Sequence, residues 1–323
     1  MTGAGQAAPR TAAGPESKVS LVATVKDAAG AVQEFLDSVA AQTRPPDEVI
    51  VADGGSTDGT LDVLHRAEGV TLVEEPGANI ARGRNLAVAG ATHDVIAVSD
   101  ADCVLDPGWL EALVDAVERG ADVAMGVSMP LTTTFFQDIA AAIAVPDPSE
   151  LREERFMPSS RSVAFRREAF LAAGGYPEWL AIGEDMFLDH RWREAGARME
   201  LVPEAVACWR ARDDLAGHWR QYVAYARGDA VAGMHPRRHA LRFGVYGGLA
   251  AALLARRRGA LALAAAGGAA YAARPVARAF RRLRGPRERA AAAVAIPALM
   301  ALTDVAKMAG YLQGLAARRG ART

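Results

Sequence analysis

The sequence predicts an α/β fold with a mainly parallel sheet, followed by a C-terminal α-helical region. Three observations predict it. Short apolar runs alternate with helix-like segments over the first half of the 323-residue chain. Acidic side chains follow several of these runs, most clearly at Asp100-Ala101-Asp102. The last part is instead basic and rich in Ala and Leu. The length suits one large domain or two smaller ones.

The expected strands are short runs rich in Val and Ile that are bounded by turn residues. They are Val19–Val25, Glu48–Asp53, Val70–Glu74, Val95–Ser99 and Val123–Val127. Helix-like segments separate them, at about Ala29–Thr43, Thr60–Glu68, Ile80–Ala89 and Gly108–Glu118. Pro45 and Pro46 would stop the first helix, and Thr60 can cap the second. This strand and helix order predicts a parallel sheet with helices on both faces.

Carboxylates follow three of the expected strands, at Asp27, Asp53 and the Asp100/Asp102 pair. Because the carboxyl ends of parallel strands meet at one edge, we expect these side chains in one ligand crevice. Two carboxylates with one residue between them can both turn toward Mg²⁺ or Mn²⁺ bridged to phosphate oxygens. The turn Lys26–Gly30 lacks a dinucleotide fingerprint, and no P-loop is present, which disfavours a dehydrogenase or a P-loop NTPase.

The net charge of −1 hides a strong division along the chain. Residues 236–323 hold 17 Lys and Arg against two acidic residues, whereas the remainder holds 20 basic and 36 acidic residues. An acidic body with a basic tail indicates two units with different surroundings. The apolar stretches of the tail favour an anionic membrane surface over nucleic acid as its partner.

The two ends and the cysteines complete the domain prediction. Residues 1–17 are rich in Ala, Gly and Pro without an apolar h-region, which predicts a disordered tail and no secretory signal. Cys103 and Cys208 form no disulfide framework, which fits a reducing compartment. We therefore expect a tail at 1–17, a catalytic domain at 18–235 and a helical, membrane-associated tail at 236–323.

Six segments over about the first 230 residues carry a family resemblance: Val19–Asp27, Asp53–Thr60, Gly77–Asn85, Ser99–Asp102, Gly174–Tyr176 and Gly183–Asp185. In residues and in order they resemble family 2 glycosyltransferases of the GT-A fold. The segment from Asp304 to Tyr311 also looks like the tails of membrane-associated bacterial members. The resemblance implies a nucleotide-sugar-binding GT-A domain and sugar transfer.

On the donor side, the resemblance implies that Asp53 accepts hydrogen bonds from a nucleobase. Thr24 and Asp27 would form the other wall of the base pocket. Arg84, the arginine directly before Asn85, would face the nucleotide. Asp102 would ligate Mn²⁺ or Mg²⁺ directly, and Asp100 would contact the ribose or a metal-bound water. A turn aspartate that bonds its own loop remains the alternative for Asp53.

On the acceptor side, Gly183-Glu184-Asp185 opens a helix that is expected to run to Ala195, with Gly196 after it. By resemblance, Asp185 is the general base and Glu184 orients it or touches the acceptor. Acidic residues are also favoured at helix N-termini without catalysis, so capping is the alternative.

The basic tail contains apolar runs at 241–255 and 259–273, separated by Arg256–Arg258. Each run is shorter than the ~20 residues that cross a bilayer. They predict a shallow hairpin in the membrane interface, with Arg274–Arg289 facing anionic headgroups. A third run, 290–302, is interrupted by Pro297. A soluble helical extension that packs on the sheet remains the alternative.

These features together predict an inverting, metal-dependent glycosyltransferase on the cytoplasmic face of a bacterial plasma membrane. It would move a sugar from a nucleotide-sugar donor to a lipid or cell-envelope glycan acceptor. A nucleotidyltransferase is one alternative, although Lys26–Gly30 is a poor triphosphate loop. A non-catalytic, membrane-tethered nucleotide-sugar binder is the other, and the retained Asp100, Asp102 and Asp185 disfavour it.

Overall fold

The computed structural model describes residues 17–320, so the predicted disordered tail lies outside the described residues except for Ser17. A mixed sheet of eight strands forms the centre of the body, in the order β3-β2-β1-β4-β7-β6-β8-β5. The strands are β1 (Val19–Val25), β2 (Glu48–Asp53), β3 (Val70–Glu74), β4 (Val95–Asp100), β5 (Cys103–Leu105), β6 (Val123–Leu131), β7 (Val163–Arg166) and β8 (Met199–Arg210).

All five predicted strands are confirmed, and β4 and β6 extend beyond their expected ends. Strands β3, β2, β1 and β4 are parallel neighbours, as expected from the strand and helix order. The second half of the sheet is mixed, because β7 runs antiparallel to both β4 and β6, while β8 runs parallel to β6. The expected α/β fold is therefore confirmed, with a parallel half that carries the crevice.

Helices cover both faces of the sheet, as predicted. Phe35 and Trp109 are buried in the apolar cluster on one face, and Phe165 and Trp192 in the cluster on the other. The helices are α1 (Val32–Ala40), α2 (Thr60–Leu64), α3 (Ile80–Gly90), α4 (Trp109–Glu118), α6 (Arg167–Ala172) and α7 (Glu184–Glu194).

Two helices of the body have boundaries that differ from the expected ones. Helix α1 is shorter at both ends than the predicted 29–43. Helix α2 ends at Leu64 and not at about Glu68. In α2, Thr60 is the first helical residue and Gly59, with φ 94°, occupies the cap position. The Thr60 hydroxyl instead accepts a hydrogen bond from Ala28 N at 2.9 Å and bonds to Asp58 Oδ1 at 2.6 Å. The side chain that suggested a cap therefore fastens α2 to the loop after β1.

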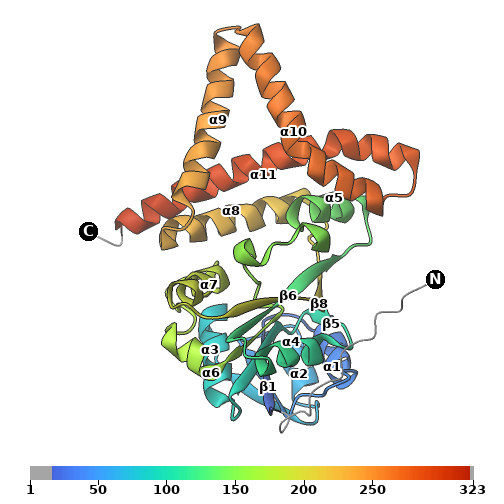
Figure 1. Ribbon diagram of the computed structural model, residues 1–323, viewed down its shortest axis with the longest axis vertical. Helices are drawn as coiled ribbons and strands as arrows, with labels where there is room; N and C mark the ends of the chain where they lie inside the picture. Colours follow the sequence, from blue (N-terminus) through green and yellow to red (C-terminus); the bar gives the residue numbers. More distant parts are fainter. Residues whose placement is uncertain (1–16, 321–323) are drawn as a thin grey trace, which may run out of the picture.

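Five helices form a second layer above the carboxyl edge of the sheet (Figure 1). They are α5 (Phe135–Ala144), α8 (Leu215–Ala232), α9 (Pro236–Leu254), α10 (Arg258–Arg282) and α11 (Pro286–Gly320). Helices α8 and α11 lie side by side, and α5 joins α10 and α11 through an apolar cluster around Ile139, Ile296 and Leu299. The C-terminal helices are therefore packed on the body at their base.

Helices α9 and α10 rise from this layer as a hairpin whose turn lies at Arg256, with φ 51° (Figure 1). Leu254 and Leu263 near the turn are 87% and 75% exposed. Residues 258–282 and 286–318 form helices long and apolar enough to cross a membrane. The expectation that the second apolar run is too short to cross a membrane was wrong, because α10 continues through Arg282. Pro297 lies inside α11 and does not interrupt that helix.

Candidate active site

A cavity of about 840 Å³ opens where β1, β2 and β4 end, and we call it the donor cavity. Thr24, Asp27, Asp100 and Asp102 line it. The parallel register places Thr24 of β1 directly beside Asp100 of β4. Asp27 is exposed, with φ 51°, and its Oδ1 accepts a hydrogen bond from Thr57 N at 2.8 Å. The structure thus brings four of the predicted donor-side residues together at the expected edge of the sheet.

Asp102 projects into the donor cavity from the turn after β4, and its side chain is exposed. Within residues 17–318 no Lys, Arg or His nitrogen lies within 4.0 Å of its carboxylate. Nearby protein atoms, which partly remove the carboxylate from water although it stays accessible, and the neighbouring Asp100 raise the pKa of Asp102 above its ordinary value. A cation at this carboxylate would relieve both effects.

Asp100 has different neighbours. Its Oδ1 accepts a hydrogen bond from Arg84 Nη2 at 2.6 Å, and its Oδ2 lies 3.5 Å from Arg161 Nε. Burial alone would raise the pKa of Asp100, but the two guanidinium groups hold it below its ordinary value. Asp100 is therefore an anion held in place by two arginines, and it leaves Asp102 as the unpaired carboxylate of the motif.

Arg84 does not line the donor cavity but lies buried behind it. Its Nη1 donates to Glu184 Oε1 at 2.5 Å, so the guanidinium joins β4 to the start of α7. Burial raises the pKa of Glu184, and Arg84 opposes this rise. Arg84 and Glu184 thus form a buried connection between the donor side and the acceptor side of the predicted site. Neither side chain lines either of the two cavities of the site.

Asp53 also lies outside the donor cavity. Its Oδ1 accepts hydrogen bonds from Gly55 N at 2.7 Å and Ser56 N at 2.8 Å, and its Oδ2 bonds to the Ser56 hydroxyl. The side chain is buried and both oxygens serve its own turn. This geometry matches the alternative that we gave for Asp53, a turn aspartate that bonds its own loop.

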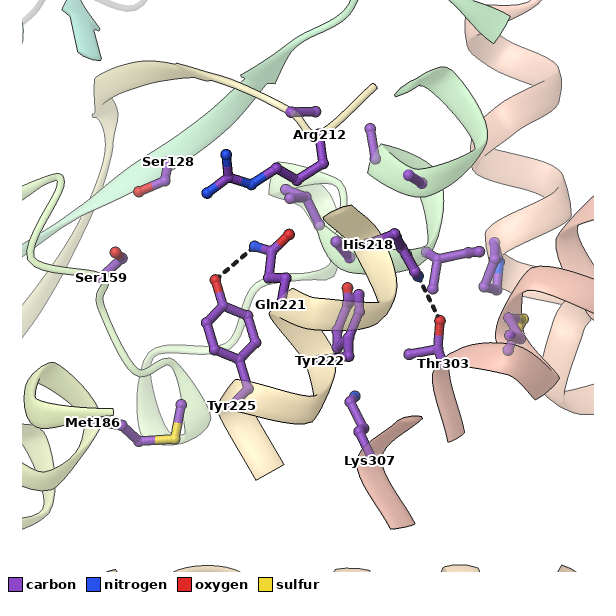
Figure 2. A pocket seen from close by; sticks show the side chains of 18 of the residues that line it. Ser128, Ser159, Met186, Arg212, His218, Gln221, Tyr222, Tyr225, Thr303 and Lys307 are labelled. Carbon is purple, nitrogen blue, oxygen red and sulfur yellow. Dashed lines mark hydrogen bonds between the residues drawn. The ribbon is translucent and has the colours of Figure 1, made fainter. Parts of the chain in front are cut away.

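A second cavity, of about 750 Å³, lies between the sheet and the helical layer, and Figure 2 shows it from close by. Asp185 lines this second cavity but not the donor cavity. At the start of α7, Asp185 Oδ1 accepts a hydrogen bond from Met186 N at 2.8 Å. Arg161 and Arg212 line both cavities and therefore mark the boundary between them.

Arg161 is the site residue that sequence reasoning missed. It lies in the irregular segment before β7, its guanidinium carbon is 5.1 Å from the centre of the Trp209 ring, and it approaches Asp100. No motif or periodic pattern surrounds it in the sequence. Only the pairing of β7 with β4 brings this segment to the site.

The described residues contain no group of three or more His, Cys, Asp or Glu side chains that could hold a metal ion by themselves. Mg²⁺ is commonly held by one or two carboxylates together with substrate phosphates and water. Asp102 in the donor cavity fits that kind of site, in which the substrate completes the coordination.

Comparison with known proteins agrees with this geometry. Residues 20–156 match the sequence profile described as Glycosyl transferase family 2. The N-acetylglucosaminyl-diphospho-decaprenol L-rhamnosyltransferase of Mycobacterium tuberculosis is 30% identical over 215 residues, covering 54% of this chain and 70% of that protein. The chain belongs to glycosyltransferase family 2.

Another relative is the succinoglycan biosynthesis protein ExoA of Rhizobium meliloti. It is 32% identical over 199 residues, covering 56% of this chain, and the match spans only 59% of ExoA. Among solved structures, this family 2 chain is similar to a mannosyltransferase from Pyrobaculum calidifontis, with a TM-score of 0.55 and 24% identity over 93% of this chain and 88% of that one. The similarity confirms the expected GT-A fold and extends over the C-terminal helices.

Proposed function

We propose that this chain is an inverting, divalent-metal-dependent glycosyltransferase that uses a nucleotide-sugar donor. One observation carries the proposal: Asp102 and Asp185 line different cavities that meet at Arg161 and Arg212. A donor in the first cavity and an acceptor in the second would face each other across this boundary. Attack from the side opposite the leaving group inverts the anomeric configuration.

On the donor side, Asp102 would hold Mn²⁺ or Mg²⁺, which supplies Lewis-acid stabilisation of charge on the leaving diphosphate. Asp100, held by Arg84 and Arg161, is an anion suited to accept hydrogen bonds from ribose hydroxyls or metal-bound water. The Mn²⁺ and GDP-mannose complex of the Pyrobaculum calidifontis mannosyltransferase supports a metal and a nucleotide sugar as the ligands.

On the acceptor side, Asp185 would act as the general base. It is partly exposed to the second cavity, so its free carboxylate oxygen can accept a proton from an acceptor hydroxyl. Glu184 keeps its buried ion pair with Arg84 and would fix the orientation of the α7 N-terminus, and with it Asp185.

The acceptor is proposed to be lipid-linked or a cell-envelope glycan. The relatives named above support this class, since one acts on a diphospho-decaprenol sugar and another serves succinoglycan synthesis. We assign residues 18–235 to catalysis and 236–323 to membrane attachment on the cytoplasmic face. The exposed leucines of the α9–α10 hairpin and the many arginines around it support attachment to an anionic surface.

The experiment that tests this proposal is incubation of the full chain with UDP-, GDP- and dTDP-sugars, with Mn²⁺ or with EDTA. We expect release of nucleoside diphosphate from one donor class with Mn²⁺ only. The anomeric configuration of the released or transferred sugar, read by NMR, should be opposite to that of the donor. Retention of configuration, or full turnover in EDTA, would refute the mechanism.

A further inference from the structure

The second cavity is strongly basic, and we call it the basic chamber. Helices α8, α9, α10 and α11 supply much of its wall. Figure 2 shows Gln221, Tyr222 and Tyr225 of α8 together with Thr303 and Lys307 of α11. The cationic side chains that line it are Arg161, Arg212, Arg238, Arg274, Arg278 and Lys307. Asp185 and Asp229 are the acidic side chains among its lining residues. A cavity of this size falls within the range of sites for small organic ligands.

Several of these cations lack a protein counter-ion. Arg278 is bound by both oxygens of Glu150, and Arg161 lies beside Asp100. For Arg212, Arg238, Arg274 and Lys307, no carboxylate oxygen lies within 4.0 Å among residues 17–318. Asp229 is already bonded to His239 Nε2 at 2.9 Å. The chamber therefore has an excess of positive charge that an anionic ligand would neutralise.

Lys307 is the most confined of these cations. It is half-buried on α11, and its Nζ lies 4.8 Å from the centre of the Tyr222 ring on α8 (Figure 2). Burial and the nearby Arg238 and Arg242 lower the pKa of Lys307 to about 8. A half-buried ammonium group with cationic neighbours is stabilised by an anion, and phosphate oxygens are suitable acceptors.

The chamber lies at the base of the α9–α10 hairpin. Arg238 comes from the first turn of α9 and Arg274 from α10, and Tyr271, which also lines the chamber, is 60% exposed. The same two helices carry the exposed leucines beyond this point. A ligand with a charged group in the chamber can therefore continue as an apolar chain along the hairpin.

The donor phosphates have a separate place, because Asp100 and Asp102 line the other cavity. Asp185 lines the chamber together with Arg161 and Arg212, which also line the donor cavity. Ser128 also lines the chamber, and its buried Oγ has no hydrogen-bond partner among the described residues.

We propose that the basic chamber binds the phosphate or diphosphate group of a lipid acceptor, with Lys307 as a principal contact. The inference rests on the proposed function and deepens it, because it adds a phosphate-recognition site built by the C-terminal helices. The sugar or hydroxyl of the acceptor reaches Asp185, the phosphate group lies against Lys307 and Arg238, and the apolar chain follows α9 and α10 into the membrane.

The test compares three probes by calorimetric titration of the full chain in detergent with EDTA, so that no metal recruits phosphate to the donor cavity. The probes are farnesyl diphosphate, inorganic pyrophosphate and farnesol. We expect farnesyl diphosphate to bind more tightly than either of the others. Lys307→Met should weaken its binding at least about tenfold, because one charge-assisted contact is lost. Lys307→Arg should restore most of the affinity.

Arg287→Met is the matched control, because Arg287 is an exposed cation on the same helix that does not line the chamber. It should bind farnesyl diphosphate like the wild type. Equal losses in Arg287→Met and Lys307→Met, or no loss in Lys307→Met, would overturn the proposal. So would pyrophosphate or farnesol binding as tightly as farnesyl diphosphate.

Failure of the proposed function is read from a different measurement. If no donor releases its nucleoside diphosphate but farnesyl diphosphate binding still depends on Lys307, the glycosyltransferase activity is refuted and the phosphate site stands. If release is normal but binding does not depend on Lys307, the phosphate site is refuted and the activity stands.

Discussion

Arg82 and Arg84 lie two residues apart on α3 and have opposite environments. The Arg84 side chain is 3% exposed and bridges the buried carboxylates of Asp100 and Glu184, whereas the Arg82 side chain is 45% exposed and pairs with Glu75 and Glu178 at the surface. Breaking a buried ion pair leaves an uncompensated charge, while surface pairs contribute little.

Arg84→Met should therefore lower the free energy of unfolding by about 3–5 kcal/mol, because it leaves buried Glu184 without its cation and Asp100 with Arg161 alone. The matched change Arg82→Met should cost less than about 1 kcal/mol. Urea denaturation of both variants measures the difference. Equal losses would show that the Arg84 network is not the buried connection described here.

Residue identities in the site were more predictable than residue partners. The position of Arg84 before Asn85 singled it out, but the expected role was a nucleotide contact, and the fold instead places it behind Asp100. Its partner Glu184 is 100 residues away, and no local pattern encodes that distance. Arg161 carried no signal at all, because it lies in an irregular segment.

At the scale of elements, strands with a continuous apolar pattern were predicted well. Strands β1, β2 and β3 have the expected boundaries. Strand β5 has three residues and β7 has four, too few for a pattern to stand out, and Pro203 and Glu204 break the pattern of β8. The mixed half of the sheet therefore could not be derived, since it depends on pairings between distant segments.

The packing of α11 on α8 gives a prediction at this scale. A Cβ on Gly310 would lie 2.1 Å from Val223 O, while a Cβ on Gly247 in α9 would meet nothing within 4 Å. Gly310→Ala should destabilise the chain by at least about 1–3 kcal/mol, because the helices must separate. Gly247→Ala should stabilise it by about 0.5–1 kcal/mol through helix propensity.

Thermal unfolding in detergent compares the two glycine variants with the wild type. The expected order of midpoints is Gly247→Ala at or above the wild type and Gly310→Ala below it. A neutral Gly310→Ala would mean that α8 and α11 are not in the close contact that builds the wall of the basic chamber.

At the scale of the whole molecule, charge predicted an acidic body and a basic helical region. In the structure these two parts pack on each other, through α5, α10 and α11. Truncation at Leu241 would not test the hairpin alone, because it would also remove α11 and expose the apolar surface of α8. Substitution of Leu253, Leu254 and Leu263 by Gln removes apolar surface from the hairpin alone. We expect this triple variant to lose most of its binding to anionic vesicles, since each buried leucine contributes about 1.5–3 kcal/mol.

Vesicle flotation measures this loss, with Leu171→Gln as control because Leu171 is 65% exposed on α6, away from the hairpin. Unchanged flotation of the triple variant would refute attachment through the hairpin. High salt should also weaken the binding, because screening reduces the attraction between arginines and headgroups. A protease-protection experiment locates the turn at Arg256. If the turn lies on the far side of the membrane, the hairpin spans the membrane and is not interfacial.

The central claim is that donor and acceptor occupy two adjoining cavities, with the metal ligand in one and the base in the other. The most direct test measures both Mn²⁺-dependent nucleotide binding and sugar transfer in two variants, Asp102→Ala and Asp185→Asn. Asp102→Ala should lose both. Asp185→Asn should keep nucleotide binding and lose about 10²–10⁴-fold in transfer rate, because only proton removal is affected. Normal transfer by Asp185→Asn, or normal Mn²⁺-dependent binding by Asp102→Ala, would contradict the account.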